Sequence, residues 1–369
     1  MTIPLVQLSG SPYEQGRQHG EALRGAIATN MAIYFDRFDR ELHLSRAETL
    51  RRAVIYAGAI AEHSPSYAAG MRGVAEGSGF SYAEIAALNV RYELFYHQFG
   101  VNALAEGCTA FAVLPEASAD GHLLIGENWD WVVGVRVAVL HSHEPDGLEI
   151  LSFSEAGIVG GKIGLNSAGV GLLINGLTST DDDWARLYSP FHVRCYEILR
   201  SRSLAAAARI VTEGHRSCSG NFIIAQAPGQ VLNIETAPRA TRATGCVGGC
   251  LAHSNHFVYP VALGVSEPPV EKIPHSYDRL RRMTELLDRR RPLALDDLQE
   301  ALRDHRGHPY SICFHIDPAE PSEAHYESVI SAIMDLHAGT LYLSDGPPCE
   351  NHHERYAITN FRPQTILSC

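Results

Sequence analysis

The chain has 369 residues, and its 30 lysines and arginines against 42 aspartates and glutamates give a formal net charge of −12 at pH 7. This acidic balance argues against nucleic acid and anionic membrane surfaces as the main partners, because both attract positive charge. Hydrophobic residues make up 45% of the chain and charged residues 20%, as in an ordinary globular protein. The length allows one large domain or two smaller ones.

Neither a membrane span nor a secretory signal is evident in the sequence. No stretch approaches the roughly 20 apolar residues that cross a bilayer, and the start Met1-Thr2-Ile3-Pro4 lacks the basic and apolar regions of a signal peptide. The 8 cysteines are too few for a disulfide scaffold in a chain of this length. We therefore expect a cytoplasmic protein with reduced thiols.

The first hundred residues are predicted to be helical. Three helix starts carry the pattern Ser-x-x-Glu, in which the serine caps a backbone N–H and the glutamate reaches back to the serine's own N–H. These pairs are Ser11/Glu14, Ser45/Glu48 and Ser81/Glu84. The third helix is expected to run over 82–96 and to stop near Gly100.

After Gly107 the pattern changes to short apolar runs separated by turn residues, which predicts strands. We expect strands at 109–114, 122–126, 135–141 and 148–154, then two runs on either side of 166–169, and further strands at 221–226, 231–235, 328–336 and 340–343. A helical pair is expected at 191–213, with further helices at 277–290 and 295–304. Helices followed by a sheet interrupted by helices indicate an α+β fold or a layered αββα design.

Several candidate motifs are weak. Residues 157–163, Gly-Ile-Val-Gly-Gly-Lys-Ile, lack the spacing of a phosphate-binding loop and are better interpreted as a glycine-rich turn. No Gly-x-Ser-x-Gly motif is present, so the usual serine-nucleophile turn is missing. The arginines at 279–291 are interrupted by Glu285 and Asp288, which favours a solvated helix face.

A zinc site is one alternative that the sequence raises. Cys246, Cys250, His253 and His256 offer four ligands within eleven residues. Structural zinc sites usually take ligand pairs from separated elements, and here too few residues lie between the pairs to fold back. In an extended strand His253 and His256 would also point to opposite faces. We therefore expect no metal site and no cofactor, and keep a non-catalytic zinc-binding or scaffold protein as the hypothesis from another class.

The segment Glu106-Gly107-Cys108-Thr109-Ala110-Phe111 lies where the helices give way to the sheet. A lone cysteine is more often a buried small hydrophobic residue than a nucleophile. Further motifs follow it in the chain: Gly-Glu-Asn-Trp-Asp-Trp at 126–131, Ser-Asn-His-Phe at 254–257, Ser-Tyr-Asp-Arg-Leu at 276–280, Tyr-Ser-Ile-Cys at 310–313 and Asp-Gly-Pro-Pro-Cys at 345–349. Residues 10–20, Gly-Ser-Pro-Tyr-Glu-Gln-Gly-Arg-Gln-His-Gly, precede it.

Together and in this order, the motifs resemble the acyl-coenzyme A:6-aminopenicillanate (isopenicillin N) acyltransferase family of N-terminal-nucleophile hydrolases. The resemblance covers nearly the whole chain. It implies a four-layer αββα sandwich with two antiparallel sheets between helical layers, preceded by a helical segment. It also implies a precursor that cuts itself between Gly107 and Cys108, giving a mostly helical segment 1–107 and a catalytic segment 108–369 that stay associated.

The chemistry of a cysteine at a new N-terminus is consistent with this resemblance. The thiolate is the nucleophilic form of cysteine, and cleavage before Cys108 would create an α-amine with an ordinary pKa of about 7.7–8.0. That amine lies a few bonds from the sulfur and can accept its proton, so no separate histidine is needed. Gly107 has no side chain, which allows the peptide to bend until the Cys108 sulfur reaches its carbonyl.

The resemblance also implies roles for other residues. Asn255 matches the family's oxyanion-stabilising asparagine, and Asp130 matches the carboxylate that orients the new amine. Thr109, Ser311 and Phe314 are expected near the substrate pocket, and Phe314 stands where the family favours a basic residue, so the substrate is expected to be less anionic. The residues alone leave other interpretations open, because Asp130 could cap a turn and Asn255 could satisfy buried backbone groups.

The sequence therefore predicts an autoprocessing cysteine enzyme that cleaves or transfers an acyl group at a small-molecule amide through a Cys108 thioester. Hydrolysis is favoured. The second enzyme hypothesis is an N-acyltransferase that takes its acyl group from acyl-coenzyme A. The small-molecule amide, acyl-coenzyme A and the two fragments of the chain are the expected partners.

Overall fold

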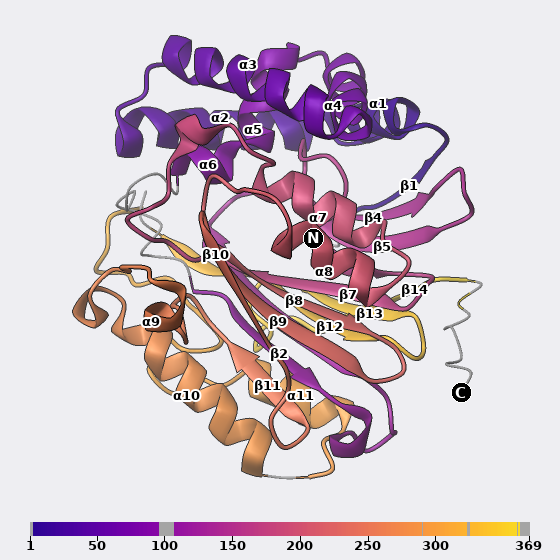
Figure 1. Cartoon of the computed structure of the whole chain (residues 1–369), viewed down its shortest axis with the longest axis vertical. Coiled ribbons are helices and arrows are strands. Elements are labelled where there is room, and N and C mark those ends of the chain that lie inside the picture. The colour runs from indigo at the N-terminus through magenta and orange to yellow at the C-terminus, as the bar shows by residue number, and fades with distance from the viewer. Residues whose placement is uncertain (1–2, 96–106, 290, 323–324, 360, 362–369) are drawn as a thin grey trace.

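The computed structural model describes residues 3–95, 107–289, 291–322, 325–359 and 361 (Figure 1). Its larger sheet contains, in spatial order, β1 (Leu5–Ser9), β4 (Val137–His143), β5 (Glu149–Glu155), β6 (Ile163–Asn166), β7 (Val170–Asn175), β8 (Gly220–Gln226), β9 (Gln230–Ala237) and β10 (Ala240–Thr244). The smaller sheet contains β11 (Cys250–His253), β2 (Thr109–Val113), β3 (Leu124–Val132), β12 (Tyr326–Asp335), β13 (Thr340–Asp345) and β14 (Glu354–Ala357). Apart from the parallel pair β1 and β4, the paired strands are antiparallel.

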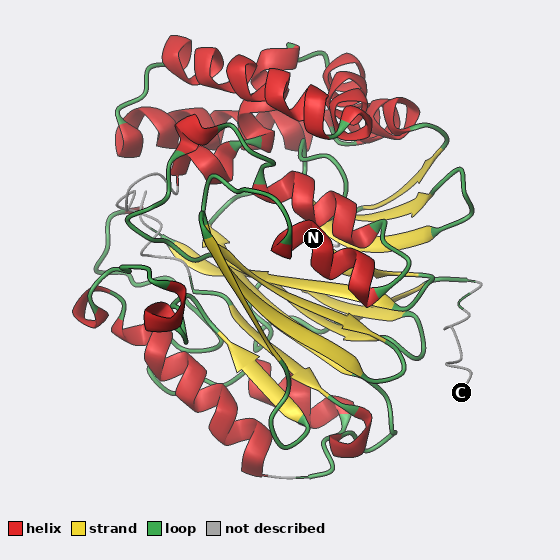
Figure 2. Ribbon diagram, viewed as in Figure 1, coloured by secondary structure: helices red, strands yellow, loops and turns green. Residues whose placement is uncertain are grey.

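The two sheets lie face to face between two helical layers (Figure 2). Helices α7 (Phe191–Leu199) and α8 (Leu204–Thr212) pack on the larger sheet, while α10 (Pro274–Arg289) and α11 (Leu295–Leu302) pack on the smaller one. Alternation along β2 divides its side chains between two cores. Ala110 and Ala112 face the core between the sheets, whereas Phe111 and Val113 pack with Leu287 of α10. The four-layer αββα sandwich is therefore confirmed. A short helix, α9 (Pro260–Leu263), lies between β11 and α10.

Residues 12–95 form a helical layer of their own, drawn in indigo and purple at the top of Figure 1. It contains α1 (Pro12–Ala22), α2 (Arg24–Leu42), α3 (Arg46–His63), α4 (Pro65–Ser78), α5 (Tyr82–Asn89) and α6 (Arg91–Phe95). The three predicted helix starts are confirmed, because the hydroxyls of Ser11, Ser45 and Ser81 each accept the backbone N–H three residues later. Among the described residues, no helix is both long enough and apolar enough to cross a bilayer.

The third predicted helix is not continuous. It breaks at Val90, where α5 ends, and α6 begins at Arg91. The break turns Arg91 into the interior, where its guanidinium pairs with Glu155 of β5. Apolar periodicity does not indicate this break, and the partner of Arg91 lies more than sixty residues away in the sequence. Tyr96 and Gly100, where this helix was expected to end, lie outside the described residues.

The helices α1 and α4 cross with their backbones in contact. A Cβ atom added at Gly16 would overlap the carbonyl oxygen of Gly70, and one added at Gly73 would overlap the carbonyl oxygen of Tyr13. Glycine is therefore required at these positions by close approach of two helices. This close contact explains why glycine occurs at Gly16 in α1 and at Gly73 in α4.

One predicted strand was too short. The strand expected at 122–126 continues as β3 through Val132, across the polar residues Glu127, Asn128 and Asp130. These side chains are buried but have hydrogen-bond partners: Glu127 accepts from the backbone N–H of Ile174, and Asn128 donates to two carbonyls in and after α11. Partners far away in the sequence make this polar strand possible. The strands β1, β10, β11 and β14 were not predicted at all.

Candidate active site

Strand register brings Cys108 together with the other two predicted catalytic residues. In the smaller sheet, Thr109 of β2 pairs with Asn128 of β3, and Ala110 pairs with His253 of β11. Continued by one or two residues, these registers place Gly107 beside Asp130 and Cys108 beside Asn255. The contacts agree with this placement, because the Cys108 Sγ lies 3.9 Å from the Asp130 carbonyl oxygen, and a Cβ on Gly107 would overlap the Asp130 carboxylate.

The thiol of Cys108 faces the space between the two sheets, on the same side of β2 as Ala110 and Ala112. It lines a cavity of ≈ 20 Å³, about the space of one water molecule. The other lining residues come from both sheets, from α7, from loops beside the larger sheet and from the helical front segment: Arg91, Tyr92, Trp129, Trp131, Lys162, Ile174, Gly176, Phe191 and His192. Cys108 itself is only 2% exposed. A cavity of this volume is too small for a substrate.

A buried group of charges lies behind this cavity. The Lys162 ammonium donates to Glu155 at 2.6 Å and lies 3.4 Å from the centroid of the Trp129 ring. Arg91 and Tyr34 of the front segment also hydrogen-bond to Glu155. Burial lowers the pKa of Lys162 to about 8, against the opposing charge of Glu155. Burial alone would raise the pKa of Glu155, but the charges of Arg91 and Lys162 bring it below its ordinary value.

Sequence reasoning missed this group. Residues 157–163 do connect two strands, β5 and β6, as the turn interpretation requires. That interpretation did not indicate that Lys162 is 1% exposed and points at the candidate site. Lysine is rarely buried without a partner, and this chain contains only two lysines, Lys162 and Lys272. No local signal linked Lys162 to its partner Glu155.

Asp130 lies within β3, not at a turn, and is fully buried. Its Oδ1 accepts a hydrogen bond of 2.6 Å from the Ser328 hydroxyl on β12. The Ser328 oxygen in turn accepts the backbone N–H of Phe314 at 3.0 Å. An irregularity in the β3–β12 pairing falls between Ser328 and Ile330, directly beside this contact. Asp130 is therefore held by the neighbouring strand next to Gly107, and the turn-cap interpretation does not apply.

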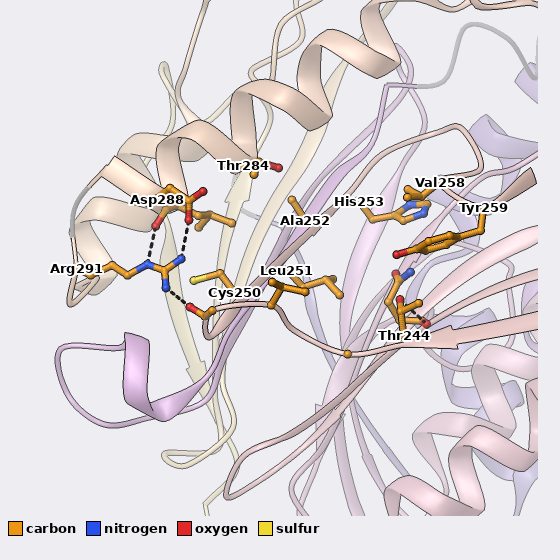
Figure 3. A pocket seen from close by; sticks show the side chains of 15 residues that line it. Thr244, Cys250, Leu251, Ala252, His253, Val258, Tyr259, Thr284, Asp288 and Arg291 are labelled. Atoms are coloured by element: carbon orange, nitrogen blue, oxygen red, sulfur yellow. Dashed lines mark hydrogen bonds and ion pairs between the residues drawn. The ribbon is translucent and has the colours of Figure 1, made fainter.

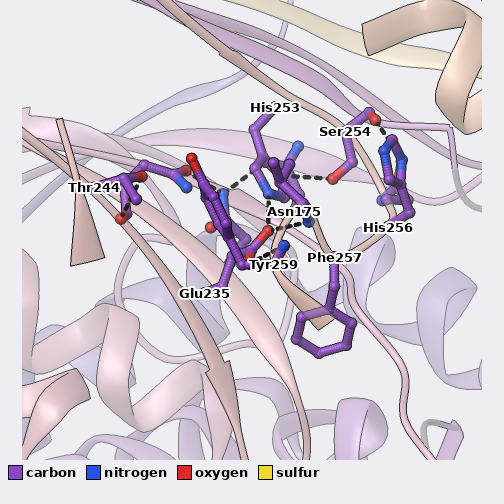
Figure 4. Close-up of polar contacts among 12 residues, drawn as sticks. Asn175, Glu235, Thr244, His253, Ser254, His256, Phe257 and Tyr259 are labelled. Carbon is purple, nitrogen blue, oxygen red and sulfur yellow. Dashed lines mark hydrogen bonds and ion pairs between the residues drawn. The ribbon is translucent and has the colours of Figure 1, made fainter. Parts of the chain in front are cut away.

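The segment that carries Asn255 is held by buried polar contacts (Figure 4). The His253 Nε2 lies 3.0 Å from the Glu235 carboxylate, which also accepts the backbone N–H groups of Val258 and Tyr259. Asn255 is held by two hydrogen bonds. Its backbone N–H donates to the Ser276 hydroxyl of α10, and its side-chain Nδ2 donates to the Gly176 carbonyl after β7 at 3.2 Å. Because Gly176 also lines the Cys108 cavity, the Asn255 amide lies at its edge.

Arg279 contacts both the Gly107–Thr109 segment and Asn255. From the sequence, it was wrongly placed on a solvated helix face. Its guanidinium donates to the carbonyl oxygens of Gly107 and Cys108, the latter at 2.7 Å, and to the Thr109 hydroxyl at 2.9 Å. A further bond of 3.1 Å reaches the Asn255 Oδ1. Burial lowers the pKa of Arg279, opposed by the charges of Asp130 and Cys108.

The helical period explains why this arginine differs from its neighbours. The buried residues of α10 are Ser276, Arg279, Met283 and Leu287, which form one stripe of the helix. Arg281 lies off this stripe, exposed and paired with Asp278. The solvated-face interpretation therefore suits Arg281 and is wrong for Arg279.

None of the three predicted pocket residues lines the small cavity, and only Thr109 and Phe314 are shown close to the Gly107–Cys108 bond. Thr109 points toward α10 and Arg279. The Ser311 hydroxyl donates to the Cys313 carbonyl at 2.6 Å, so it is used within its own loop. The Phe314 ring lies against Gly107, where an added Cβ would overlap it.

The cysteines and histidines of the zinc hypothesis do not converge. His253 contacts Glu235, and the His256 ring stacks on Tyr277 with centroids 3.7 Å apart. Two groups of three or more potential ligands converge within 4.8 Å among the described residues, and neither includes Cys246, Cys250, His253 or His256. The structure therefore gives no support to a zinc site there.

A wider pocket lies elsewhere (Figure 3). Its volume is ≈ 540 Å³, and β11, α10 and the loops beside them form its walls. Arg291 pairs with Asp288 at one end, and His253 and Tyr259 lie at the other. Cys108 is not among its lining residues. Neither the predicted nucleophile nor Asp130 lines this pocket, so we do not assign the candidate active site to it.

The candidate site is therefore built around Cys108, which directly precedes β2 and faces the space between the two sheets of the αββα sandwich. A sequence model of the family described as acyl-coenzyme A:6-aminopenicillanic acid acyl-transferase matches residues 117–348. This match spans more than half of the chain, which therefore belongs to that family. The family predicted from the ordered motifs is confirmed.

Individual relatives are more distant. The chain is 27% identical over 322 residues to the 40 kDa form of acyl-coenzyme A:6-aminopenicillanic-acid-acyltransferase from Emericella nidulans, and the alignment covers 84% of each protein. Among solved structures, it is similar to a Caenorhabditis elegans ortholog of N-acylethanolamine-hydrolyzing acid amidase, with a TM-score of 0.47, 13% identity and coverage of 62% of this chain and 93% of that one. Penicillin V acylase from Agrobacterium tumefaciens gives a TM-score of 0.46 and 12% identity, with coverage of 64% and 83%.

We expect Arg279→Met to lower the free energy of unfolding by at least about 3 kcal/mol, because several buried acceptors lose a charged donor. The matched control is Arg281→Met on the exposed face of the same helix, which should change it by less than about 0.5 kcal/mol. Urea denaturation of both variants makes the comparison. Equal effects of the two substitutions would contradict the role assigned to the Arg279 contacts.

Proposed function

We propose that the protein is an autoprocessing cysteine amidohydrolase in which Cys108 attacks a small-molecule amide and carries the acyl group as a thioester. The observation that supports this most is the arrangement at residues 107 and 108. The Cys108 thiol lines a cavity between the sheets, and the carbonyl of the preceding Gly107 accepts a hydrogen bond from a buried arginine. Family membership supports acyl-group chemistry at this site.

The first reaction in this proposal is cleavage of the chain by itself. The Cys108 sulfur adds to the Gly107 carbonyl carbon, and Arg279 stabilises the negative charge that develops on the oxygen. The C–N bond then breaks, and the nitrogen takes up a proton and becomes the α-amine of Cys108. Water hydrolyses the resulting thioester, which leaves a carboxylate on Gly107 and a free thiol on Cys108.

In turnover, the new α-amine accepts the thiol proton as the sulfur attacks the substrate carbonyl. Asp130, held beside Gly107 by Ser328, orients the amine. The Asn255 amide donates to the oxyanion of the tetrahedral intermediate. Its Oδ1 is held by Arg279, which fixes the direction in which its N–H groups point. Proton transfer to the leaving nitrogen gives the amine product, and water releases the acid from the sulfur.

The intact chain is a zymogen in this proposal, because its cavity at Cys108 has the volume of a single water molecule. Segments 1–107 and 108–369 then act as the small and large subunits. They remain associated because Arg91 and Tyr34 of the front segment bond to Glu155 in the larger sheet, and β1 pairs with β4. The small subunit also lines the cavity through Arg91 and Tyr92.

Transfer from acyl-coenzyme A is the second candidate, and the sequence relation to an acyl-coenzyme A acyltransferase favours it. Both reactions share the Cys108 thioester and differ in what resolves it. Release of free coenzyme A that requires an amine acceptor would identify transfer. Release of acid from an amide at a rate independent of added amine would identify hydrolysis.

We expect the purified wild-type protein to consist of two fragments, 1–107 and 108–369. Intact-mass spectrometry under denaturing conditions measures this directly, and N-terminal sequencing should begin at Cys108. Cys108→Ala should remain one chain without turnover, while Cys108→Ser should be cut slowly at most, because a hydroxyl is a weaker nucleophile than a thiolate. Cys195→Ala is a matched control, since that thiol is also buried but is not among the residues that line the Cys108 cavity. Turnover by a single uncut chain would rule out the proposal.

We expect Asn255→Ala to lower kcat by about 10²- to 10³-fold with little change in KM, because an oxyanion donor acts mainly in the transition state. Asn255→Asp should be worse, since an ionised carboxylate has no donor and repels the oxyanion. Melting temperatures measured on the same preparations separate this from a structural effect. Full kcat in a folded but less stable Asn255→Ala variant would show that Asn255 only forms structural hydrogen bonds with the backbone and does not stabilise the oxyanion.

A further inference from the structure

Four potential metal ligands converge at a place that no part of the reaction uses. His305, Cys313 and His315 lie in the segment between α11 and β12, and Cys349 lies in the turn between β13 and β14. Their ligand atoms all lie within 4.8 Å of one another. The closest pairs are His305 Nε2 to His315 Nε2 at 3.1 Å and Cys313 Sγ to Cys349 Sγ at 3.5 Å. The His315 Nε2 lies 3.4 Å and 3.3 Å from the two sulfurs.

These four separations are close to four of the six edges of a tetrahedron around one small cation. Zinc bonds of about 2.3 Å to sulfur and about 2.05 Å to nitrogen imply edges of about 3.8 Å between sulfurs, about 3.6 Å between sulfur and nitrogen, and about 3.3 Å between nitrogens. Each separation given above is shorter than its ideal edge by a few tenths of an ångström. The order of the three kinds of edge is also the expected one.

Hydrogen bonding alone does not explain the cluster. An imidazole nitrogen carries either one proton or one lone pair, yet the His315 Nε2 faces three groups at once: the His305 Nε2 and two sulfurs. A disulfide between Cys313 and Cys349 would not explain why the nitrogens of His305 and His315 also point to the centre of the cluster. A cation at the centre of the four atoms satisfies all of them.

We propose that His305, Cys313, His315 and Cys349 bind one zinc ion. Two thiolates and two imidazoles in a tetrahedron are typical ligands of structural zinc. On binding, each cysteine loses its proton and the two sulfurs form bonds to the metal, so two protons are released and the site is electrically neutral. From the sequence, no metal site was expected. The site proposed here differs from the one considered there at Cys246, Cys250, His253 and His256.

The surroundings support a permanent site. Cys313 is fully buried, whereas His305 and Cys349 are exposed and leave a path for the ion to enter. The Glu350 carboxylate lies 3.9 Å from the His315 Nδ1, on the side away from the cluster, where carboxylates commonly orient zinc-bound histidines. The Arg303 side chain donates to the Pro348 carbonyl at 2.9 Å, so the two ligand-bearing segments are also joined by a direct bond.

Four protein ligands leave no open position for a substrate, so the role of this ion is structural. It would tie the segment before β12 to the turn after β13. Phe314 lies between two of the ligands in sequence, and its ring contacts Gly107. The ion would therefore hold the wall that Phe314 forms beside the candidate cleavage bond.

The test uses full-length protein without a histidine tag, isolated with reductant, and elemental analysis by mass spectrometry. We expect about one zinc ion per chain, and most of it lost in His305→Ala and in Cys349→Ala. His308→Ala is the matched control, because His308 lies beside the cluster, with ring centroids 5.2 Å from His315, but is not one of the four ligands. Replacement of zinc by cobalt should give the visible bands of a tetrahedral site with thiolate ligands.

Stability gives a second readout. A chelator should lower the Tm of the wild-type protein by several degrees and leave that of Cys349→Ala unchanged, since the exposed Cys349 can be replaced without disturbing the core. The uncut Cys108→Ala protein should bind the same amount of zinc, which separates this proposal from the proposed function. Absence of zinc after reconstitution, iron in its place, a Cys313–Cys349 disulfide in the reduced preparation, or equal loss in His308→Ala would each overturn the proposal.

Discussion

The structure around the candidate site depends on one buried cation, the guanidinium of Arg279. A charge removed from water is tolerated only when polar partners replace its hydration. Here the partners are the backbone at Gly107 and Cys108, the Thr109 hydroxyl and the Asn255 side chain. Because these groups come from the start of β2 and the loop after β11, one helix fixes the relative position of these two segments. The bond from Arg279 also polarises the Gly107 carbonyl, which in the proposed self-cleavage would favour attack on that carbonyl.

A second buried charge group joins the front segment to the sandwich. Glu155 on β5 receives hydrogen bonds from Lys162, Arg91 and Tyr34, and the last two belong to the helical segment before Gly107. Removal of one partner would leave a buried charge uncompensated, which is strongly unfavourable. The two proposed fragments are thus held together by interior contacts as well as by packing, and both contribute to the cavity at Cys108.

Local patterns in the sequence predicted the elements whose causes are local. Ser11 and Ser81 begin helices because their own hydroxyls and nearby glutamates cap them, and apolar alternation located most of the strands. Prediction failed where the cause is a distant partner. The polar residues of β3 are paired with residues from other strands and helices, and Arg279 is distinguished from Arg281 only by the face of α10 that packs on the sheet. Cys108 was found because the ordered motifs of a family accompany it, not because its own surroundings in the sequence are distinctive.

Mass spectrometry of the enzyme stopped during turnover tests the central claim most directly. A small-molecule amide or an acyl-coenzyme A is mixed with the enzyme, the reaction is quenched with acid, and the peptides are mapped. The account predicts an acyl group on a peptide whose first residue is Cys108, removable by neutral hydroxylamine as a thioester is. An acyl group on any other residue, or turnover by protein in which Gly107 and Cys108 remain joined, would contradict it.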